Sequence, residues 1–399
     1  MSQQRNTSGR ARGSNSRRAV LQTVGVGLSG AIAGCVNLDA GGSSESMEPP
    51  PFGPLETDWP VVGGDPANTG HRPSAPGPVD DPVIDWQVQP CSDGQPSVAV
   101  VDDILAVGGD ESVYVYDLSA GERHFTVDVD GPAPIALDEE TCYVRSSPDR
   151  LHAYDLADGT ERWQIDADAP VIDPIVDDET VYLFDETGVV YALDVVDGTK
   201  RWTATVGDRL DGKRANDGQL ATDGTSVVAM SRDSMMAFEA DTGDQLWQVD
   251  LQCCRAPGPI IAEESVWTLR HGFRSWELTT GEPRWQYDPG SSDPRGLTVD
   301  GQSAYFGRRA IHAVDRETGE RRWRAHDGVM SPTGRPVCGT DTLYVPTGPP
   351  PHFITAVDPN NGSVRWTERV GNNRSSLILA GDRLFAATTD GGLYSITEE

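Results

Sequence analysis

Lysine is nearly absent from this sequence: only Lys200 and Lys213 occur among 399 residues. Acidic residues outnumber basic ones by 62 to 32, which gives a formal net charge of −30. Nucleic acids and anionic lipid surfaces are polyanions, and they repel a chain of this charge. We therefore expect no nucleic-acid partner and no membrane binding through surface charge.

The kind of acidic residue is also uneven, since Asp is about twice as frequent as Glu. An excess of Asp with few Lys resembles the composition of proteins from extreme halophiles. In such proteins short carboxylates hold water and cations, and concentrated salt screens their mutual repulsion. This resemblance predicts that the fold is lost at low ionic strength, whereas a merely acidic surface would tolerate dilution.

Long apolar runs are missing as well. The stretch from Ala19 to Ala33 is too short and too rich in Gly for a membrane span, but it suits the apolar part of a signal peptide. Arg17 and Arg18 precede it as in a twin-arginine export signal. The residues before Cys35 resemble a lipobox, which makes Cys35 the expected lipid-bearing residue. The alternative is an uncleaved signal anchor with an incidental cysteine.

These features predict a division of the chain into three parts. Residues 1–34 form a twin-arginine lipoprotein signal peptide, and residues 35–58 form a lipid-anchored tether rich in Gly, Ser and Pro. Residues 59–399 form one folded domain. The expected location is the outer face of the cytoplasmic membrane, with the lipid at Cys35 as the anchor.

One pattern recurs seven times and indicates the fold. Each copy contains alternating apolar residues, an acid, a Gly four positions later and an aromatic residue after four more. Alternation indicates a strand, the Gly a tight turn, and the aromatic ring fills the space between neighbouring sheets. The final aromatic residues are Phe125, Trp163, Trp202, Trp247, Trp285, Trp323 and Trp366, spaced 38 to 45 residues apart.

Each unit also has a second hairpin before this pattern, so that it forms a four-stranded antiparallel sheet, the size of a propeller blade. Residues 393–396 begin an eighth copy that lacks its Gly and Trp, and residues 83–88 around Trp86 form a strand without a hairpin of its own. We therefore predict an all-β, eight-bladed propeller in which the N-terminal strand completes the last blade. Seven blades, with one irregular copy, is the alternative.

The repeat resembles the tryptophan-docking repeat of the quinoprotein-like (PQQ-like) propeller family, with Ala153, Asp155, Gly159 and Trp163 as one match. Residues 59–70 also resemble the lead-in segment of such proteins. The resemblance implies the fold, whereas function varies within a fold. One branch of the family comprises pyrroloquinoline-quinone (PQQ) dehydrogenases with calcium, and another comprises non-catalytic lipoproteins similar to BamB. The anchor signal and the chain length favour the second branch.

The adjacent residues Cys253 and Cys254 are the one feature of the sequence that resembles the enzyme branch. Quinoprotein alcohol dehydrogenases carry a disulfide between adjacent cysteines against the quinone, so the resemblance implies such a bond here. Two neighbouring thiols or a structural turn are the alternatives, and the pairing of the remaining cysteines stays open. We identify no metal site, no catalytic residues and no convincing set of calcium ligands in the sequence.

Four arginines recur just before or at the innermost strands of consecutive blades: Arg255, Arg295, Arg335 and Arg374. Near the rim of a central funnel, converging guanidinium groups could bind a carboxylate or a phosphate. The alternative is that each arginine pairs with a local Asp.

Together these observations predict a monomeric, non-catalytic scaffold that binds a protein partner or an extracellular polymer and needs no cofactor. A PQQ-dependent alcohol or sugar dehydrogenase that uses the central funnel is the alternative function.

Overall fold

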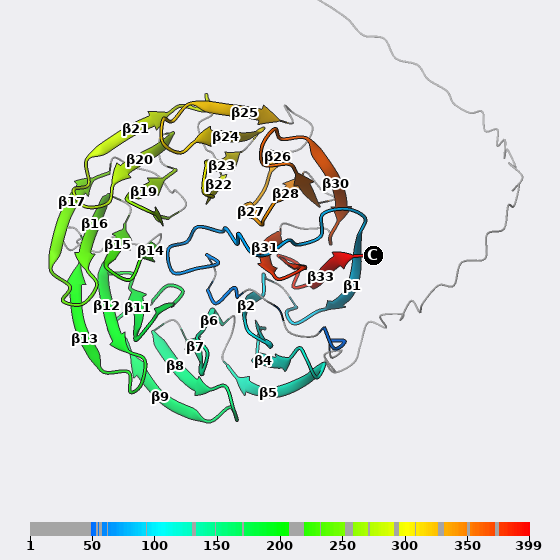
Figure 1. Cartoon of the computed structure of the whole chain (residues 1–399). Helices are drawn as coiled ribbons and strands as arrows, with labels where there is room; N and C mark the ends of the chain where they lie inside the picture. The colour runs from blue at the N-terminus through cyan, green and yellow to red at the C-terminus, as the bar shows by residue number, and fades with distance from the viewer. Residues whose placement is uncertain are drawn as a thin grey trace, which may run out of the picture. The chain divides into compact units, whose positions relative to one another are not determined.

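Eight antiparallel sheets surround a common axis in the computed structural model, and they form an eight-bladed β-propeller (Figure 1). The innermost strand of each sheet contacts that of the next, and β31 contacts β2, which closes the ring. All regular elements of the described residues are β-strands. Within these residues, we find no helix with the length and hydropathy needed to cross a membrane.

The structure describes a defined set of residues. They are 49–52, 55, 58–61, 63–92, 94–129, 133–147, 149–169, 171–206, 219–231, 233–251, 258–269, 272–290, 295–307, 309–325, 331–348, 352–371 and 375–399.

Blades are numbered here in chain order, and the strands of each run outward from the axis. Blade 1 comprises β2 (Ser97–Val101), β3 (Ile104–Gly108), β4 (Ser112–Asp117) and β5 (Glu122–Asp128). Blade 2 comprises β6 (Ile135–Leu137), β7 (Thr141–Ser147), β8 (Arg150–Asp155) and β9 (Glu161–Asp166). Blade 3 comprises β10 (Ile175–Asp177), β11 (Thr180–Phe184), β12 (Val189–Asp194) and β13 (Lys200–Thr205). Blade 4 comprises β14 (Gln219–Thr222), β15 (Ser226–Met230), β16 (Ser234–Glu239) and β17 (Gln245–Asp250).

The second half of the ring repeats this order. Blade 5 comprises β18 (Ile260–Ala262), β19 (Ser265–Thr268), β20 (Phe273–Glu277) and β21 (Pro283–Tyr287). Blade 6 comprises β22 (Arg295–Val299), β23 (Ser303–Gly307), β24 (Ile311–Asp315) and β25 (Arg321–Ala325). Blade 7 comprises β26 (Ser331–Pro332), β27 (Val337–Cys338), β28 (Leu343–Gly348), β29 (Phe353–Val357) and β30 (Val364–Arg369). Blade 8 comprises β31 (Ser375–Ala380), β32 (Arg383–Thr388), β33 (Leu393–Glu398) and β1 (Pro82–Val88).

The recurring Trp joins each blade to the next. Between blades 2 and 3, the indole of Trp163 donates a hydrogen bond of 2.9 Å to the carbonyl of Val195. Gly198 in the same turn has φ +70, and a Cβ on it would lie only 2.7 Å from the Trp163 ring. Glycine is therefore required there for two reasons, the left-handed backbone and the close approach of the indole. Contacts of this kind join the Trp of one copy of the repeat to the Gly of the next copy.

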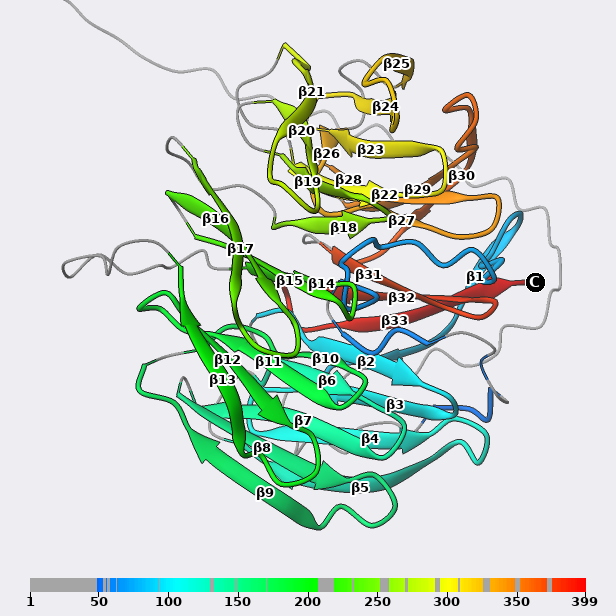
Figure 2. The ribbon, with the colours of Figure 1, turned by 60° about the vertical axis from the view of Figure 1, so that its left-hand side comes forward.

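Strand β1 completes blade 8 by pairing with β33 in antiparallel register, from Pro82 opposite Glu398 to Val88 opposite Leu393. Both views show β1 beside the red β33 (Figures 1 and 2). The eight-blade prediction is confirmed, with closure by the N-terminal strand, and the seven-blade alternative is excluded.

Blade 7 differs from the expected four-stranded sheet. Its innermost strand is broken into β26 and β27, both of which pair with β28. Pro336 lies in the gap, and because proline has no N–H it cannot continue a hydrogen-bond ladder. The break leaves Arg335 outside the strands, between the two pieces of the innermost strand.

Candidate functional site

The described residues of the range 59–77 lie across the centre of the ring, and we call them the central plug. In Figure 1 this blue segment runs between the innermost strands rather than outside them. Trp59 and Val100 exchange two backbone hydrogen bonds, of 2.6 and 2.9 Å. The plug thus begins with an isolated antiparallel β-bridge to β2 of blade 1.

Backbone hydrogen bonds then join the plug to one blade after another. Carbonyl groups of the plug accept from innermost strands, and near its end Gly77 donates to Gly381 beside β31. The pairs are Leu137 N–H to Pro60 (2.9 Å), Thr222 to Pro66 (2.9 Å), Ile261 to Ala67 (2.9 Å), Val299 to Thr69 (3.1 Å), Cys338 to Gly70 (2.9 Å) and Gly77 to Gly381 (3.2 Å). With the Trp59 pair, the plug is bonded to every blade except blade 3 among the described residues.

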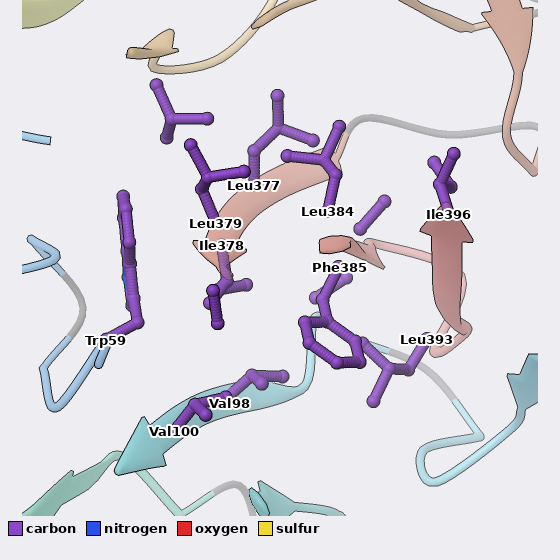
Figure 3. Packing of buried hydrophobic residues seen from close by; sticks show 14 of the residues in the cluster. Trp59, Val98, Val100, Leu377, Ile378, Leu379, Leu384, Phe385, Leu393 and Ile396 are labelled. Carbon is purple, nitrogen blue, oxygen red and sulfur yellow. The ribbon is translucent and has the colours of Figure 1, made fainter. Parts of the chain in front are cut away.

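Side chains fix the plug further. The ring of Trp59 is almost fully buried in the cluster that includes Val100 and Leu379, and Figure 3 shows it beside these residues. The Arg72 guanidinium lies over the Trp59 ring, 5.3 Å from its centre, and pairs with Asp65 at 3.3 Å. The side chain of Asn68 donates to the carbonyls of Leu220 (2.5 Å) and Pro259 (3.3 Å), and so ties the plug to blades 4 and 5.

The plug closes one end of the propeller axis. Its partners Val100, Leu137, Thr222 and Val299 are each the last or next-to-last residue of an innermost strand. We call this side of the ring the plug face. The opposite end, where the innermost strands begin, is where the sequence placed its candidate funnel residues.

Arg335 reaches the plug from blade 7. Its Nη2 donates to the carbonyl of Asn68, and its Nε is buried without a partner among the described residues. Burial lowers the pKa of Arg335 to about 10, an effect that the charge of Asp65 partly opposes. A buried cation with a spare donor is costly, which makes Arg335 the funnel arginine with the clearest physical constraint.

The other predicted funnel residues are less constrained. Arg295 is the first residue of β22 and half-buried, and it has no ion pair with a described residue. A Cβ on the neighbouring Gly296 would lie 2.6 Å from the Arg335 Cα, so the backbones that carry the two arginines touch. Arg255 and Arg374 lie outside the described residues, as do Cys253 and Cys254.

The aromatic residues of the repeat occupy the blade junctions. Five indoles donate to a carbonyl of the following blade: Trp163, Trp202, Trp247, Trp285 and Trp323. Trp366 donates instead to Pro78, just after the plug, at 3.0 Å. The Phe125 ring packs so closely against Gly159 of the following blade that a Cβ on Gly159 would collide with it. The Trp86 indole nitrogen is buried without a partner among the described residues.

Cysteines of the described residues are inert. Cys91, Cys142 and Cys338 are free and buried. Burial raises the pKa of both the Cys91 and Cys142 thiols to about 12, so neither carries a thiolate near neutral pH. Arg17, Arg18 and Cys35 lie outside the described residues.

Sequence reasoning missed a polar pair near the start of β10. The Nη1 of Arg145 donates to the carbonyl of Val171 at 2.8 Å. Burial raises the pKa of Asp173, and the charge of Arg145 opposes that rise. No spacing in the sequence joins Arg145 and Asp173, because one lies within the second strand of blade 2 and the other precedes the first strand of blade 3.

A second missed feature lies on the plug face, and we call it the acidic pocket. It is a cavity of about 830 Å³ that lies between Asp58 with the plug residues Pro60 and Pro66 on one side and the turns 137–141 and 176–178 of blades 2 and 3 on the other. Val195 and Val196 also line it. One signal in the sequence does point to it, since both turns are acidic: Asp-Glu-Glu-Thr at 138–141 and Asp-Asp-Glu-Thr at 177–180.

Comparison with known proteins identifies relatives of this arrangement. The profile of a family described as outer membrane protein assembly factor BamB matches residues 109–325 and, in a second match, residues 307–399. The fold is similar to BamB from Moraxella catarrhalis, with a TM-score of 0.62 and 16% identity over 79% of this chain and 99% of that one.

Two further structures share the fold. One is the quinohemoprotein alcohol dehydrogenase from Comamonas testosteroni, with a TM-score of 0.63 and 14% identity over 85% of this chain and 80% of that chain. The other is the computationally designed Ika8 protein, with a TM-score of 0.64 and 12% identity over 77% and 99%. None of the curated proteins matches the sequence significantly. At these identities the structures show a common fold and not a common activity.

Proposed function

The chain belongs to the family of the outer membrane protein assembly factor BamB, a family of quinoprotein-like propellers, and from this premise we propose that it is a non-catalytic scaffold that binds a protein partner or an extracellular polymer outside the cytoplasmic membrane. The central plug is the observation that carries the proposal. A segment bonded to seven blades holds the ring rigid and closes the axis on one face. Rigid, preorganised surfaces bind partners with little loss of conformational entropy.

The proposal includes how the scaffold is held. Residues 1–34 direct export by the twin-arginine route, the lipid on Cys35 anchors the chain, and residues 35–58 separate the propeller from the membrane. The propeller itself acts as a monomer. Support comes from the order of the sequence features around Arg17, Arg18 and Cys35. Replacing Cys35 by Ser should move the protein from the membrane fraction to the soluble fraction, and an unchanged distribution would contradict the anchor.

The enzyme alternative implies that PQQ binds together with calcium. Among the described residues, no three His, Cys, Asp or Glu side chains are grouped as metal ligands. Calorimetric titration of the protein with PQQ and calcium tests the enzyme alternative: no saturable binding is expected, and one quinone per chain would overturn the proposal. In that case, replacement of Cys253 and Cys254 by Ser would show whether they contact the quinone.

Partner binding is tested by isolating the membrane-anchored protein in concentrated salt after crosslinking. A scaffold should bring down the same partner in repeated preparations, and a variant unable to fold should not. Recovery of the protein alone, in every preparation, would count against the scaffold.

A further inference from the structure

The acidic pocket lies beside blade 3, the blade to which the described plug residues make no backbone hydrogen bond. Between Pro60, bonded to blade 2, and Pro66, bonded to blade 4, no backbone hydrogen bond joins the described plug residues to β10 of blade 3. The cavity of about 830 Å³ opens in this interval. That volume falls within the range of natural ligand sites, about 300–1,000 Å³.

Most of the carboxylates that line the pocket lack a positive partner. Asp138 and Glu140 are engaged: Asp138 accepts from the hydroxyl of Tyr143 at 2.6 Å, and Glu140 pairs with Arg162 at 3.4 Å. Arg162, the one basic residue among the described residues of the lining, is already shared with Asp155 at 2.9 Å. The lining therefore carries a strong excess of negative charge.

Glu139, Asp177 and Asp178 form no ion pair with any described residue. Burial and the neighbouring charge of Asp178 raise the pKa of Asp177, so the folded protein disfavours the charged form of its carboxyl group. Structural Asp residues elsewhere in the blades behave differently. For example, the bond from Arg201 and the amide of Val196 lower the pKa of Asp194. A cation from outside the chain would relieve Asp177.

Apolar surface lies beside these carboxylates. Leu137 and Val176 form buried walls, and Val196 at the rim is 75% exposed, the most exposed large apolar residue among those described. A bare metal ion gains nothing from such surface, and no metal-ligand group exists among the described residues. The side chains of Arg and Lys join an aliphatic stem to a charged head, and they match a pocket with both kinds of wall.

We propose that the acidic pocket is a docking site for Arg or Lys side chains of a partner polypeptide. The proposal rests on the scaffold function and specifies the chemistry of the partner: a basic segment that lays its stems on Val176 and Val196 and its charges against Asp177 and Asp178. The pocket is on the plug face, so docking leaves the opposite end of the axis free.

The probe is a short arginine peptide, and its control is the same peptide with citrulline, which keeps the shape but removes the charge. Binding to the purified full chain is measured by calorimetry at two salt concentrations that both keep the protein folded. The arginine peptide should saturate at one site and bind more weakly at the higher salt concentration, because salt screens ion pairs. The citrulline peptide should bind at least about tenfold more weakly.

Variants locate the site. Asp177→Asn with Asp178→Asn should weaken the arginine peptide about tenfold. Asp178 has φ +46, a conformation that Asn tolerates, and loss of repulsion favours folding of the double variant. The control is Asp241→Asn with Asp244→Asn, which removes two exposed charges outside the pocket lining and should leave affinity within about twofold. Glu139→Gln provides an independent single replacement at an exposed position of the lining.

Equal binding of both peptides, or equal weakening by both double variants, would overturn the proposal, since binding would then reflect counter-ions on an acidic surface. Absence of binding would overturn it as well. Neither result removes the scaffold, because a partner recovered from cells by both the wild type and the pocket variant would bind elsewhere. Loss of that partner in the pocket variant alone would support both proposals.

Discussion

The backbone N–H of Phe52 donates a hydrogen bond of 2.8 Å to the carbonyl of Leu118. At five other blade junctions, the indole of the preceding blade donates to the carbonyl at the same place in the turn, as Trp163 does to Val195. At the closing junction between blades 8 and 1, Phe52 therefore takes the acceptor that the repeat would assign to Trp86. This leaves the Trp86 indole nitrogen buried without a partner among the described residues.

Phe52 should consequently stabilise the closure of the ring. Its ring contacts those of Trp86 and Phe385, at 6.2 and 6.4 Å between centroids, and the Arg383 guanidinium lies 3.8 Å from it. Phe52→Ala should lower the free energy of unfolding by about 2 kcal/mol, less than for a fully buried Phe. Urea unfolding measures the change. Leu246→Ala, at a residue 43% exposed, is the control and should cost much less.

The two classes of docking tryptophan should respond differently to loss of the indole nitrogen. Trp247 donates to the carbonyl of Leu278 at 2.6 Å, whereas the Trp86 nitrogen has no described partner. Trp247→Phe should therefore cost about 1 kcal/mol more than Trp86→Phe, because only the first leaves a buried acceptor unsatisfied. Urea unfolding of both variants measures the difference. Equal losses would mean that the indole contributes by its size alone.

Two aspartates should show opposite effects of charge removal. The amide of Ala157 and the Arg162 guanidinium lower the pKa of Asp155, so its charge stabilises the folded state above its ordinary pKa of 3.8, and this stabilisation is lost as the pH falls. Burial and the charge of Asp178 raise the pKa of Asp177, so its charge opposes folding above pH 3.8. At pH 7, Asp155→Asn should lower the melting temperature and Asp177→Asn should raise it. Both differences should shrink as the pH approaches 4, and shifts of the same sign at pH 7 would contradict this account.

Much of the propeller could be read from the sequence because its repeat is local. The acid, the Gly and the Trp of one copy lie within nine residues, so the repeat can be recognised in a short stretch of sequence. The contact between Gly198 and Trp163 then follows from placing neighbouring copies side by side in the ring. The orphan strand around Trp86 was sufficient to predict the closure by β1.

The candidate site was less predictable because its contacts join distant segments. The hydrogen bond between Arg335 and Asn68 joins residues 267 positions apart in the sequence, and the bond between Asn68 and Leu220 joins residues 152 positions apart. A resemblance to a lead-in segment indicated that residues 59–70 belong to the fold, but not that they cross its axis. The acidic turns at 138–141 and 177–180 were visible, yet only their meeting beside Pro60 and Pro66 makes a pocket.

The stability of the whole fold should depend on salt. With 62 acidic and 32 basic residues, the folded chain concentrates negative charge that the unfolded chain spreads over a larger volume. The melting temperature should fall steadily from molar salt to about 0.1 M, where the screening length reaches about 10 Å. Circular dichroism at several concentrations of potassium chloride measures this. A melting temperature independent of salt would contradict the resemblance to halophilic proteins.

Arg335 should hold the plug rather than the blades, and a local measurement distinguishes the two roles. Its side chain donates to the Asn68 carbonyl, but burial lowers its pKa to about 10, so the buried charge also costs free energy. Because these effects oppose each other, the global stability of Arg335→Met is a poor guide to its role. Hydrogen exchange is a better one, since the amides of Ile261, Val299 and Cys338 donate to the plug.

In Arg335→Met these three amides should exchange about tenfold faster, as expected when an interaction of about 1.4 kcal/mol is lost, while amides within blade 3 keep their rates. The matched control is Arg201→Met, which removes an arginine that pairs with Asp194 at 2.7 Å in β12 and β13, remote from the plug. It should leave the plug amides unchanged. If exchange at Ile261 and Val299 were equally slow in both variants, the backbone bonds alone would hold the plug, and Arg335 would be free to serve the opposite end of the axis as an anion-binding residue.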